Sequence, residues 1–266
     1  INLIMKTLDF VKLSPAQNMT VLVLSEVNRA EQPSTASNLM RSDRIGAEQV
    51  GFVELSDIAE SRLQMMGGEF CGNATASLAA YLCAATDRTD FNLEVSGADS
   101  PVKCHVEKKN GEYIVTVDMP LPLNVDEIML PELSSESLTI VSFPGITHII
   151  MENKPSELTL SVFSKLCRRL TQIAIDVIVL NESKMFISPA IYVSDTDQIV
   201  YERGCGSGSA AVGAYLANKY GKSVSVDVYQ QGGTINVCAE LGPDNKLKQL
   251  AITVPVFICA KGTAYL

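Results

Sequence analysis

The stretch Cys71-Gly72-Asn73-Ala74-Thr75-Ala76 has a near copy at Cys205-Gly206-Ser207-Gly208-Ser209-Ala210. Each stretch leads into the same tripeptide, Ala-Tyr-Leu, at residues 80–82 and 214–216. The residues that follow each Cys-Gly opening are small or apolar and leave almost no polar helical face, as expected of a buried helix. Both segments are therefore predicted to be helices enclosed by sheet.

The likeness continues downstream of each helix. Residues 91–95 match 224–228, residues 102–104 match 236–238, and residues 117–120 match 252–255. A helix followed by strand-like runs in the same order indicates a duplicated unit rather than chance matching of one motif. The predicted fold class is therefore α+β, with two similar halves that each wrap a curved sheet or barrel around a central helix.

The boundary between the halves is predicted from composition. The Pro- and acid-rich stretch Pro120 to Ser137 lies between the repeats and is interpreted as the linker. Met5 is taken as the native start, so the N-terminal domain is expected to span 5–122 and the C-terminal domain 123–255. The last strand is expected to cross back, with residues 256–266 completing the first domain.

Composition narrows the class of protein. Hydrophobic residues make up 47% of the 266 positions and charged residues 19%, which favours a folded globule. The net charge of −9 gives no electrostatic basis for binding nucleic acid or an anionic membrane. Seven cysteines without any C-x-x-C pair predict free thiols in a reducing compartment, and the cytoplasm is the expected location.

The two Cys-Gly segments contain the candidate reactive groups. A cysteine at a helix start lies beside unpaired backbone N–H groups and the positive end of the helix dipole, and both favour the thiolate. We expect this setting to lower the cysteine pKa from about 8.5 toward neutrality. The backbone at Gly72 and Gly206 can also bind a carboxylate. Taken alone, a cysteine in such a helix is more often a core residue, but the duplication favours a function.

Two opposed thiols suit inversion of an amino acid. If one thiolate removes the α-proton from one face and a thiol delivers a proton to the other face, the centre inverts. The resulting carbanion is stabilised by donors aimed at the carboxylate. This scheme needs no pyridoxal phosphate, and we expect no cofactor and no metal. Cys104 and Cys238 also repeat, but they fall in strands and are interpreted as packing residues.

At these residues the sequence resembles the diaminopimelate epimerase family across nearly the whole chain. Gln17-Asn18-Met19, Ile45 to Gln49, Cys71-Gly72-Asn73 and Tyr201-Glu202-Arg203-Gly204 with the second cysteine motif carry the likeness. The resemblance implies two pseudo-symmetric domains of the diaminopimelate epimerase-like fold. Two departures from the family stand out. An acid-threonine insertion usually separates the Glu-Arg-Gly segment from the second cysteine in the family, whereas here Gly204 directly precedes Cys205 and the second motif is shorter. The family also binds the distal amino acid head of its substrate with asparagines, and Gln64, Ile146 and residues 177–178 occupy those positions here.

The sequence is more similar to a smaller branch, the histidine racemases. Asn18-Met19-Thr20, residues 48–52, residues 68–75, the shortened second motif and Gln231-Gly232-Gly233 carry this likeness. It implies racemisation of histidine, with Cys71 and Cys205 as the proton-transfer groups and Glu48 against the imidazole. The other implied substrate contacts come from the two helix starts and the segments near them: Asn18, Gly72, Asn73, His148, Glu202, Arg203, Gly206 and Ser207.

Other interpretations of the sequence stay open. Within the same family, the alternatives are a diaminopimelate epimerase and a racemase of another amino acid. A thiol redox or metal-binding protein is a different class, disfavoured by the lack of C-x-x-C and by the presence of two histidines only. A third alternative is an inactive family member that binds a small molecule. The expected partner is a small-molecule substrate, an amino acid, and a homodimer is left open.

Overall fold

The computed structural model describes residues 6–153, 158–172, 174–194 and 197–266, so the expected start at Met5 lies outside the described residues. The chain forms two compact units. Unit 1 comprises Ile1–Asp118 and Thr253–Leu266, and unit 2 comprises Met119–Ile252. The boundaries predicted from composition fell a few residues later, after residues 122 and 255.

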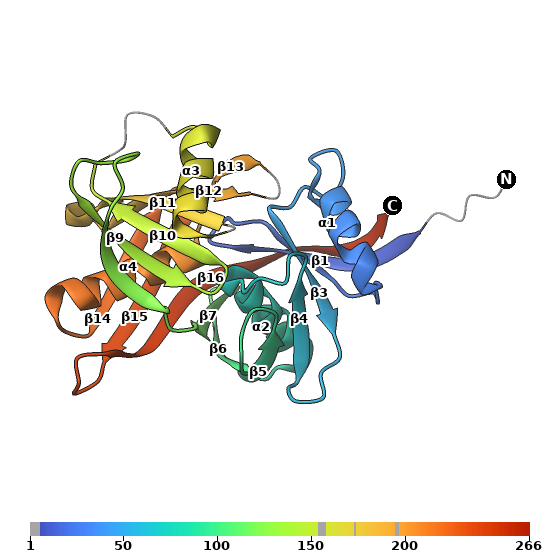
Figure 1. Ribbon diagram of the computed structural model, residues 1–266. Helices are drawn as coiled ribbons and strands as arrows, with labels where there is room; N and C mark the ends of the chain where they lie inside the picture. The colour runs from blue at the N-terminus through green and yellow to red at the C-terminus, as the bar shows by residue number, and fades with distance from the viewer. Residues whose placement is uncertain (1–5, 154–157, 173, 195–196) are drawn as a thin grey trace. The chain divides into compact units, whose positions relative to one another are not determined.

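Unit 1 is a closed ring of strands around a helix (Figure 1). Its strands pair in the order β1 to β7, then β16, and β16 returns to pair with β1. Helix α2 contacts all seven strands from β1 to β7, which explains why it has almost no polar face. The bounds are β1 Thr7–Pro15, β2 Thr20–Val23, α1 Gln32–Met40, β3 Gln49–Glu54, β4 Ser61–Met65, α2 Gly72–Thr86, β5 Asp90–Val95, β6 Val102–Lys109, β7 Glu112–Asp118 and β16 Leu247–Tyr265.

Unit 2 repeats this order of elements. Its strands pair in the order β8, β9, β10, β11, β12, β14, β15 and β16, and β13 pairs with residues 190–193 of β12. Helix α4 packs against β8, β9, β10, β14 and β15. The bounds are β8 Asn124–Met129, β9 Ser137–Phe143, β10 Ile146–Met151, α3 Leu160–Leu170, β11 Ala174–Asn181, β12 Phe186–Val193, β13 Gln198–Tyr201, α4 Gly206–Tyr220, β14 Val224–Gln230 and β15 Gly233–Leu241.

Equivalent connections make the duplication explicit. In unit 1, β2 and β3 are parallel neighbours joined through α1, and β4 and β5 are parallel neighbours joined through α2. In unit 2, β10 and β11 are joined through α3, and β12 and β14 through α4, again as parallel pairs. Parallel neighbours need a crossover connection, and a helix supplies it in each case. A mixed fold of helices and strands is confirmed, and so are the two predicted central helices, α2 and α4.

One prediction about organisation was wrong. The stretch expected to be a linker, Pro120 to Ser137, contains strand β8, which pairs with β9 from Asn124↔Ser142 to Met129↔Ser137. Four of its six side chains are exposed and the other two are half-buried. The strand therefore lacks the alternation of buried and exposed side chains by which a sequence indicates a β-strand. An edge strand rich in acidic side chains is easily mistaken for a connection.

Candidate functional site

Cys71 is the N-cap residue of α2. Its backbone is extended, with φ −132° and ψ 109°, and its Sγ accepts a hydrogen bond from the backbone N–H of Ala74 at 3.4 Å. The hydroxyl of Thr75 donates back to the Cys71 carbonyl at 2.7 Å. The sulfur therefore lies at the N-terminal end of a buried helix, as the sequence predicted. Gly72 and Asn73 form the first turn and are buried.

A chain of neutral polar groups leads from the Cys71 sulfur into the sheet. The thiol donates to Oε1 of Gln49 at 2.7 Å. Nε2 of Gln49 donates to Oδ1 of Asn18 at 2.5 Å and to the hydroxyl of Thr20 at 3.0 Å. The structure thus connects the predicted residue Asn18 to Cys71. It does so through Gln49, which was not among the predicted site residues although it adjoins Glu48.

Cys205 repeats the arrangement at the start of α4. Its backbone has φ −108° and ψ 109°, and its Sγ accepts from the N–H of Gly208 at 3.2 Å. The hydroxyl of Ser209 donates to the Cys205 carbonyl at 2.7 Å, and the hydroxyl of the predicted residue Ser207 lies 3.5 Å from the sulfur. Gln230 accepts from the Cys205 backbone N–H at 2.6 Å. Capping hydrogen bonds thus hold both cysteines in one conformation.

The electrostatics of Cys205 overturn one expectation. The sequence predicted a lowered pKa at both helix starts. Burial, followed by the negative charges of Glu202 and Asp176, instead raises the pKa of the Cys205 thiol well above its ordinary value. The Ser207 hydroxyl and the Gly208 N–H act in the opposite direction but are outweighed. Only 2% of Cys205 is exposed, and loss of water destabilises a thiolate more than one helix end stabilises it.

His148 lies inside the protein as half of a buried pair. Its Nδ1 is 2.9 Å from Oδ2 of Asp176, and both side chains are 0% exposed. Oδ1 of Asp176 accepts from the backbone N–H of Ala190 at 3.1 Å. The ring of Phe143 meets the imidazole edge-on, with centroids 5.7 Å apart. Asp176 was not predicted, although a single acid in the apolar run from Ala174 to Leu180 is a signal that could have identified it.

The remaining predicted residues lie on segments next to these helix starts. Glu48 is exposed just before β3, and its backbone N–H donates to the Met19 carbonyl at 2.7 Å. Lys12 holds the preceding loop by donating to the carbonyls of Ile45 and Gly46 at 3.0 and 2.8 Å. The segment between β13 and α4 contains Glu202 and Arg203, and Gly206 begins α4.

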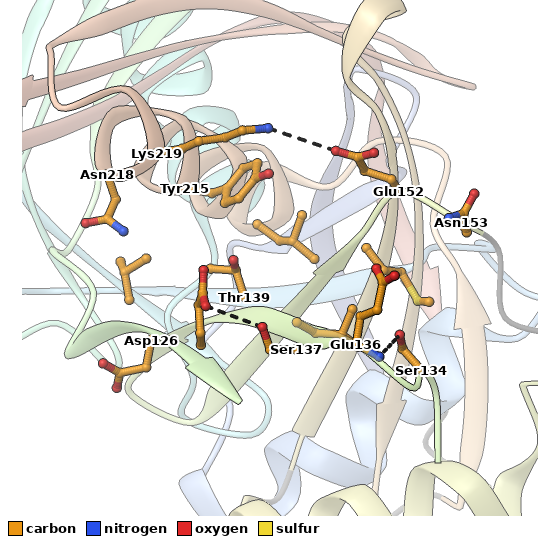
Figure 2. A pocket seen from close by; sticks show the side chains of 15 residues that line it. Asp126, Ser134, Glu136, Ser137, Thr139, Glu152, Asn153, Tyr215, Asn218 and Lys219 are labelled. Atoms are coloured by element: carbon orange, nitrogen blue, oxygen red, sulfur yellow. Dashed lines mark hydrogen bonds and ion pairs between the residues drawn. The ribbon is translucent and has the colours of Figure 1, made fainter. Parts of the chain in front are cut away.

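A pocket of about 600 Å³ lies elsewhere in unit 2, beside the C-terminal half of α4 (Figure 2). Tyr215, Asn218 and Lys219 line it together with residues of β8, β9 and β10. Lys219 extends toward Glu152, with 3.9 Å between Nζ and Oε1. Cys205 caps the opposite end of α4, about 20 Å along the helix axis. This pocket is therefore separate from the candidate site.

Neither a metal centre nor a membrane-spanning helix is found within the described ranges. No group of three or more His, Cys, Asp and Glu side chains there is arranged to hold a metal ion. Among the same residues, no helix has both the length and the apolar character needed to cross a membrane.

Comparison with solved structures identifies the fold. A phenazine biosynthesis protein of the PhzF family from Bacillus anthracis matches with a TM-score of 0.72 at 16% identity, covering 97% of this chain and 99% of that one. A hydroxyproline epimerase from Agrobacterium vitis, solved with bound trans-4-hydroxy-L-proline, also has a TM-score of 0.72, at 11% identity and with 98% and 93% coverage. The chain therefore has the mixed α/β fold of the PhzF proteins and the proline racemase-like epimerases.

Comparison with curated sequences is more specific. A histidine racemase from Fusobacterium nucleatum is 29% identical over 273 residues, which is 98% of each chain. A histidine racemase from Staphylococcus aureus is 30% identical over 280 residues, again 98% of each chain. The family model described as the N-terminal domain of the histidine racemase CntK matches residues 7–265. With nearly its whole length covered, the chain belongs to the histidine racemase CntK N-terminal domain family.

Proposed function

We propose that this protein is a cofactor-independent isomerase that converts L-histidine to D-histidine and back. The observation that carries the proposal is the duplicated helix start. In a chain of this family, Cys71 and Cys205 occupy equivalent N-cap positions with equivalent capping hydrogen bonds. Two similar thiols on two similar units match the demand of racemisation, which needs a proton-transfer group for each face of the α-carbon.

The proposed reaction has two proton transfers. The thiolate of one cysteine removes the α-proton and becomes a thiol, leaving a carbanion whose charge spreads into the substrate carboxylate. The thiol of the other cysteine then protonates the opposite face and becomes a thiolate. Each turnover therefore leaves the two cysteines with exchanged protonation states, and the reverse reaction starts from the exchanged form. The mechanism requires both sulfurs to reach one α-carbon from opposite sides.

Backbone N–H groups at the two helix starts are the proposed carboxylate site. Gly72 and Asn73 form the first turn of α2, and Gly206 and Ser207 form the first turn of α4. N–H groups in a first turn have no partner within their own helix and lie at its positive end. They would stabilise the carboxylate most when it acquires the carbanion's charge.

We propose that the substrate side chain binds to the polar segments next to the two helix starts. Glu48 is exposed, and its carboxylate can accept an N–H from either a neutral or a charged imidazole. Asn18 and Glu202 are the proposed groups for the α-amino group, Arg203 is proposed to orient Glu202, and His148 is proposed to lie near this end of the substrate. We also propose that each unit has the diaminopimelate epimerase-like form of this fold, in which a barrel of strands surrounds the central helix.

The residues at the positions where the family holds the distal head favour histidine over diaminopimelate. Val177 and Ile178 are fully buried, and Gln64 is engaged with the Met65 carbonyl and with Arg62. A distal ammonium and carboxylate would lose charge-assisted hydrogen bonds worth about 1.5 to 3 kcal/mol each. A compact imidazole makes no such demand.

Incubation in D2O tests the proposal. The reduced protein is mixed separately with L-histidine and with LL-diaminopimelate, and optical inversion and α-deuterium are followed together. We expect inversion and deuterium uptake with histidine only. Inversion of diaminopimelate alone would replace the proposal with the epimerase, and reaction with neither substrate would contradict both.

A further inference from the structure

The buried pair of His148 and Asp176 occupies a special place in the duplicated fold. His148 lies opposite Asp176 in the parallel pairing of β10 with β11. In unit 1 the equivalent strands are β2 and β3, and there Thr20 lies opposite Gln49. Gln49 is the residue whose amide bonds to the Cys71 sulfur. The carboxylate and imidazole of unit 2 therefore stand where unit 1 has an uncharged amide and hydroxyl.

Asp176 also lies close to its own cysteine. A Cβ built on Gly208 would be 3.1 Å from Sγ of Cys205 and 3.2 Å from Oδ2 of Asp176. These two atoms are thus within about 6 Å of each other, a separation at which one negative charge disfavours a second. Glu202, from the segment between β13 and α4, adds to this effect, and the Ser207 hydroxyl and Gly208 N–H oppose it.

The hydrogen bonds of the pair specify a protonation state. The Asp176 carboxylate accepts from the Ala190 backbone N–H and needs a second donor, which the imidazole can supply only as Nδ1–H. Nε2 of His148 is buried and has no hydrogen-bond partner among the described residues. A proton there would leave a buried donor without an acceptor and a buried positive ring. The neutral ring with hydrogen on Nδ1 avoids both costs.

We infer that Asp176 is a positioning residue for the second cysteine: its carboxylate fixes His148 as the neutral Nδ1–H tautomer and holds Cys205 as a thiol in the resting protein. Cys205 is then the proton donor of the first transfer and Cys71 the acceptor. This assignment of roles rests on the proposed racemisation. The protonation states themselves do not, and they can be measured without substrate.

Alkylation gives the first test. The reduced protein is treated with iodoacetamide between pH 6 and 11, and the rate at Cys205 is followed by peptide mass spectrometry. In the wild type we expect the midpoint of the Cys205 rate profile to lie above the ordinary thiol value of about 8.5. Asp176→Asn keeps the shape of the side chain and removes its charge, so the midpoint should fall by about one pH unit.

Asp227→Asn is the matched control, because it makes the same change in unit 2 on β14, where the carboxylate bonds to Asn236 at the surface. The control should leave the Cys205 midpoint unchanged. An Asp176→Asn midpoint equal to that of the wild type would overturn the inference, whatever the protein does to histidine.

The second test needs no variant of the buried pair and so holds even if Asp176→Asn fails to fold. The chain has two histidines, and His105→Gln removes the exposed one and assigns the other. In the ¹⁵N spectrum of protein labelled at histidine, His148 should show a protonated Nδ1 and a bare Nε2 at pH 7.5. Hydrogen on Nε2 alone, or on both nitrogens, would contradict the inference.

Discussion

The starts of α2 and α4 share a backbone and differ in the groups around their sulfurs. Both cysteines have extended N-cap geometry, accept from the N–H three residues ahead and receive a hydroxyl bond at their carbonyl. Cys71 is half-buried and donates to a neutral amide. Cys205 is fully enclosed and near two carboxylates. The two units thus share the contacts that fix each sulfur in space, and they differ in the groups on the neighbouring strands, where Gln49 meets Cys71 and Asp176 lies near Cys205.

The largest expected effect tests whether both helix starts are needed. Cys71→Ser and Cys205→Ser should each lower the rate of histidine racemisation by about 10³-fold, because a hydroxyl is a far weaker proton-transfer group at neutral pH. Circular dichroism should show both variants folded. Cys259→Ser is the matched control, since that thiol is exposed on β16, and it should keep wild-type activity. Substantial turnover by either serine variant would exclude the two-thiol mechanism.

The third position of each helix offers a direct exchange between the two regions. Unit 1 has Ala74 there and unit 2 has Gly208. A Cβ at Gly208 would lie 3.1 to 3.2 Å from Cys205, Asp176 and Ile178. Crowding of this kind costs about 1 to 3 kcal/mol, and the helix preference of Ala over Gly, about 1 kcal/mol, offsets only part of it. Gly208→Ala should therefore destabilise the fold and also lower activity.

The reciprocal change, Ala74→Gly, adds no atoms and removes one buried methyl, so it should cost about 1 kcal/mol of helix preference and introduce no crowding. Urea unfolding of the two variants measures the difference. Equal losses would mean that the crowding around Cys205 is not special to unit 2.

A single substitution can make the first helix start resemble the second. Gln49→Glu places a carboxylate where the amide accepts from the Cys71 thiol. We expect the pH midpoint of Cys71 alkylation to rise by about one unit and racemisation near pH 7 to slow accordingly. Gln49→Met removes the polar contact without adding charge and serves as the control. A similar midpoint in both variants would show that charge is not what distinguishes the two sulfurs.

The comparison of the two units extends to the second repeated pair of cysteines, Cys104 and Cys238, for which we expect a smaller effect, on the pH dependence of stability. Burial raises the pKa of both Cys104 and Cys238, and Cys104 is the more deeply buried. A raised pKa in the folded state means that the folded protein binds more protons than the unfolded chain above about pH 8.5. Stability from such a thiol is complete below that pH and is lost as pH rises, by at most about 1.4 kcal/mol per unit.

Urea midpoints at pH 7.5 and 9.5 measure this loss. Cys104→Ala should flatten the alkaline decline more than Cys238→Ala does. The opposite order would show that burial does not set the acidity of these thiols.

The sequence alone was sufficient to predict the structural features that repeat in the two units. Two Cys-Gly openings with identical Ala-Tyr-Leu endings predicted both central helices, and the N-cap positions of Cys71 and Cys205 follow from them. Strand β8 was missed because an edge strand with exposed acids carries no buried alternation. Gln49 and Asp176 were missed for another reason: each acts across neighbouring strands, and strand register is not visible in the order of residues.

The acidity of Cys205 could not be foreseen for a related reason. A helix start is local in sequence, and its effect on a thiol can be anticipated. What opposes it is burial, together with the negative charges of Glu202 and of Asp176, and Asp176 lies on β11, far from α4 in the chain. Local rules therefore gave the wrong direction for the pKa where distant residues control the environment.

Strand β16 also determines when the first unit can be finished during synthesis. It completes the ring of unit 1 by pairing with β1, yet all of unit 2 separates the two strands in sequence. On the ribosome, the edges of β1 and β7 stay open while unit 2 is made, and such edges invite wrong pairing. Closure across so long a loop is also slow. The nascent chain therefore exposes the edges of β1 and β7 until residues 253–265 have emerged.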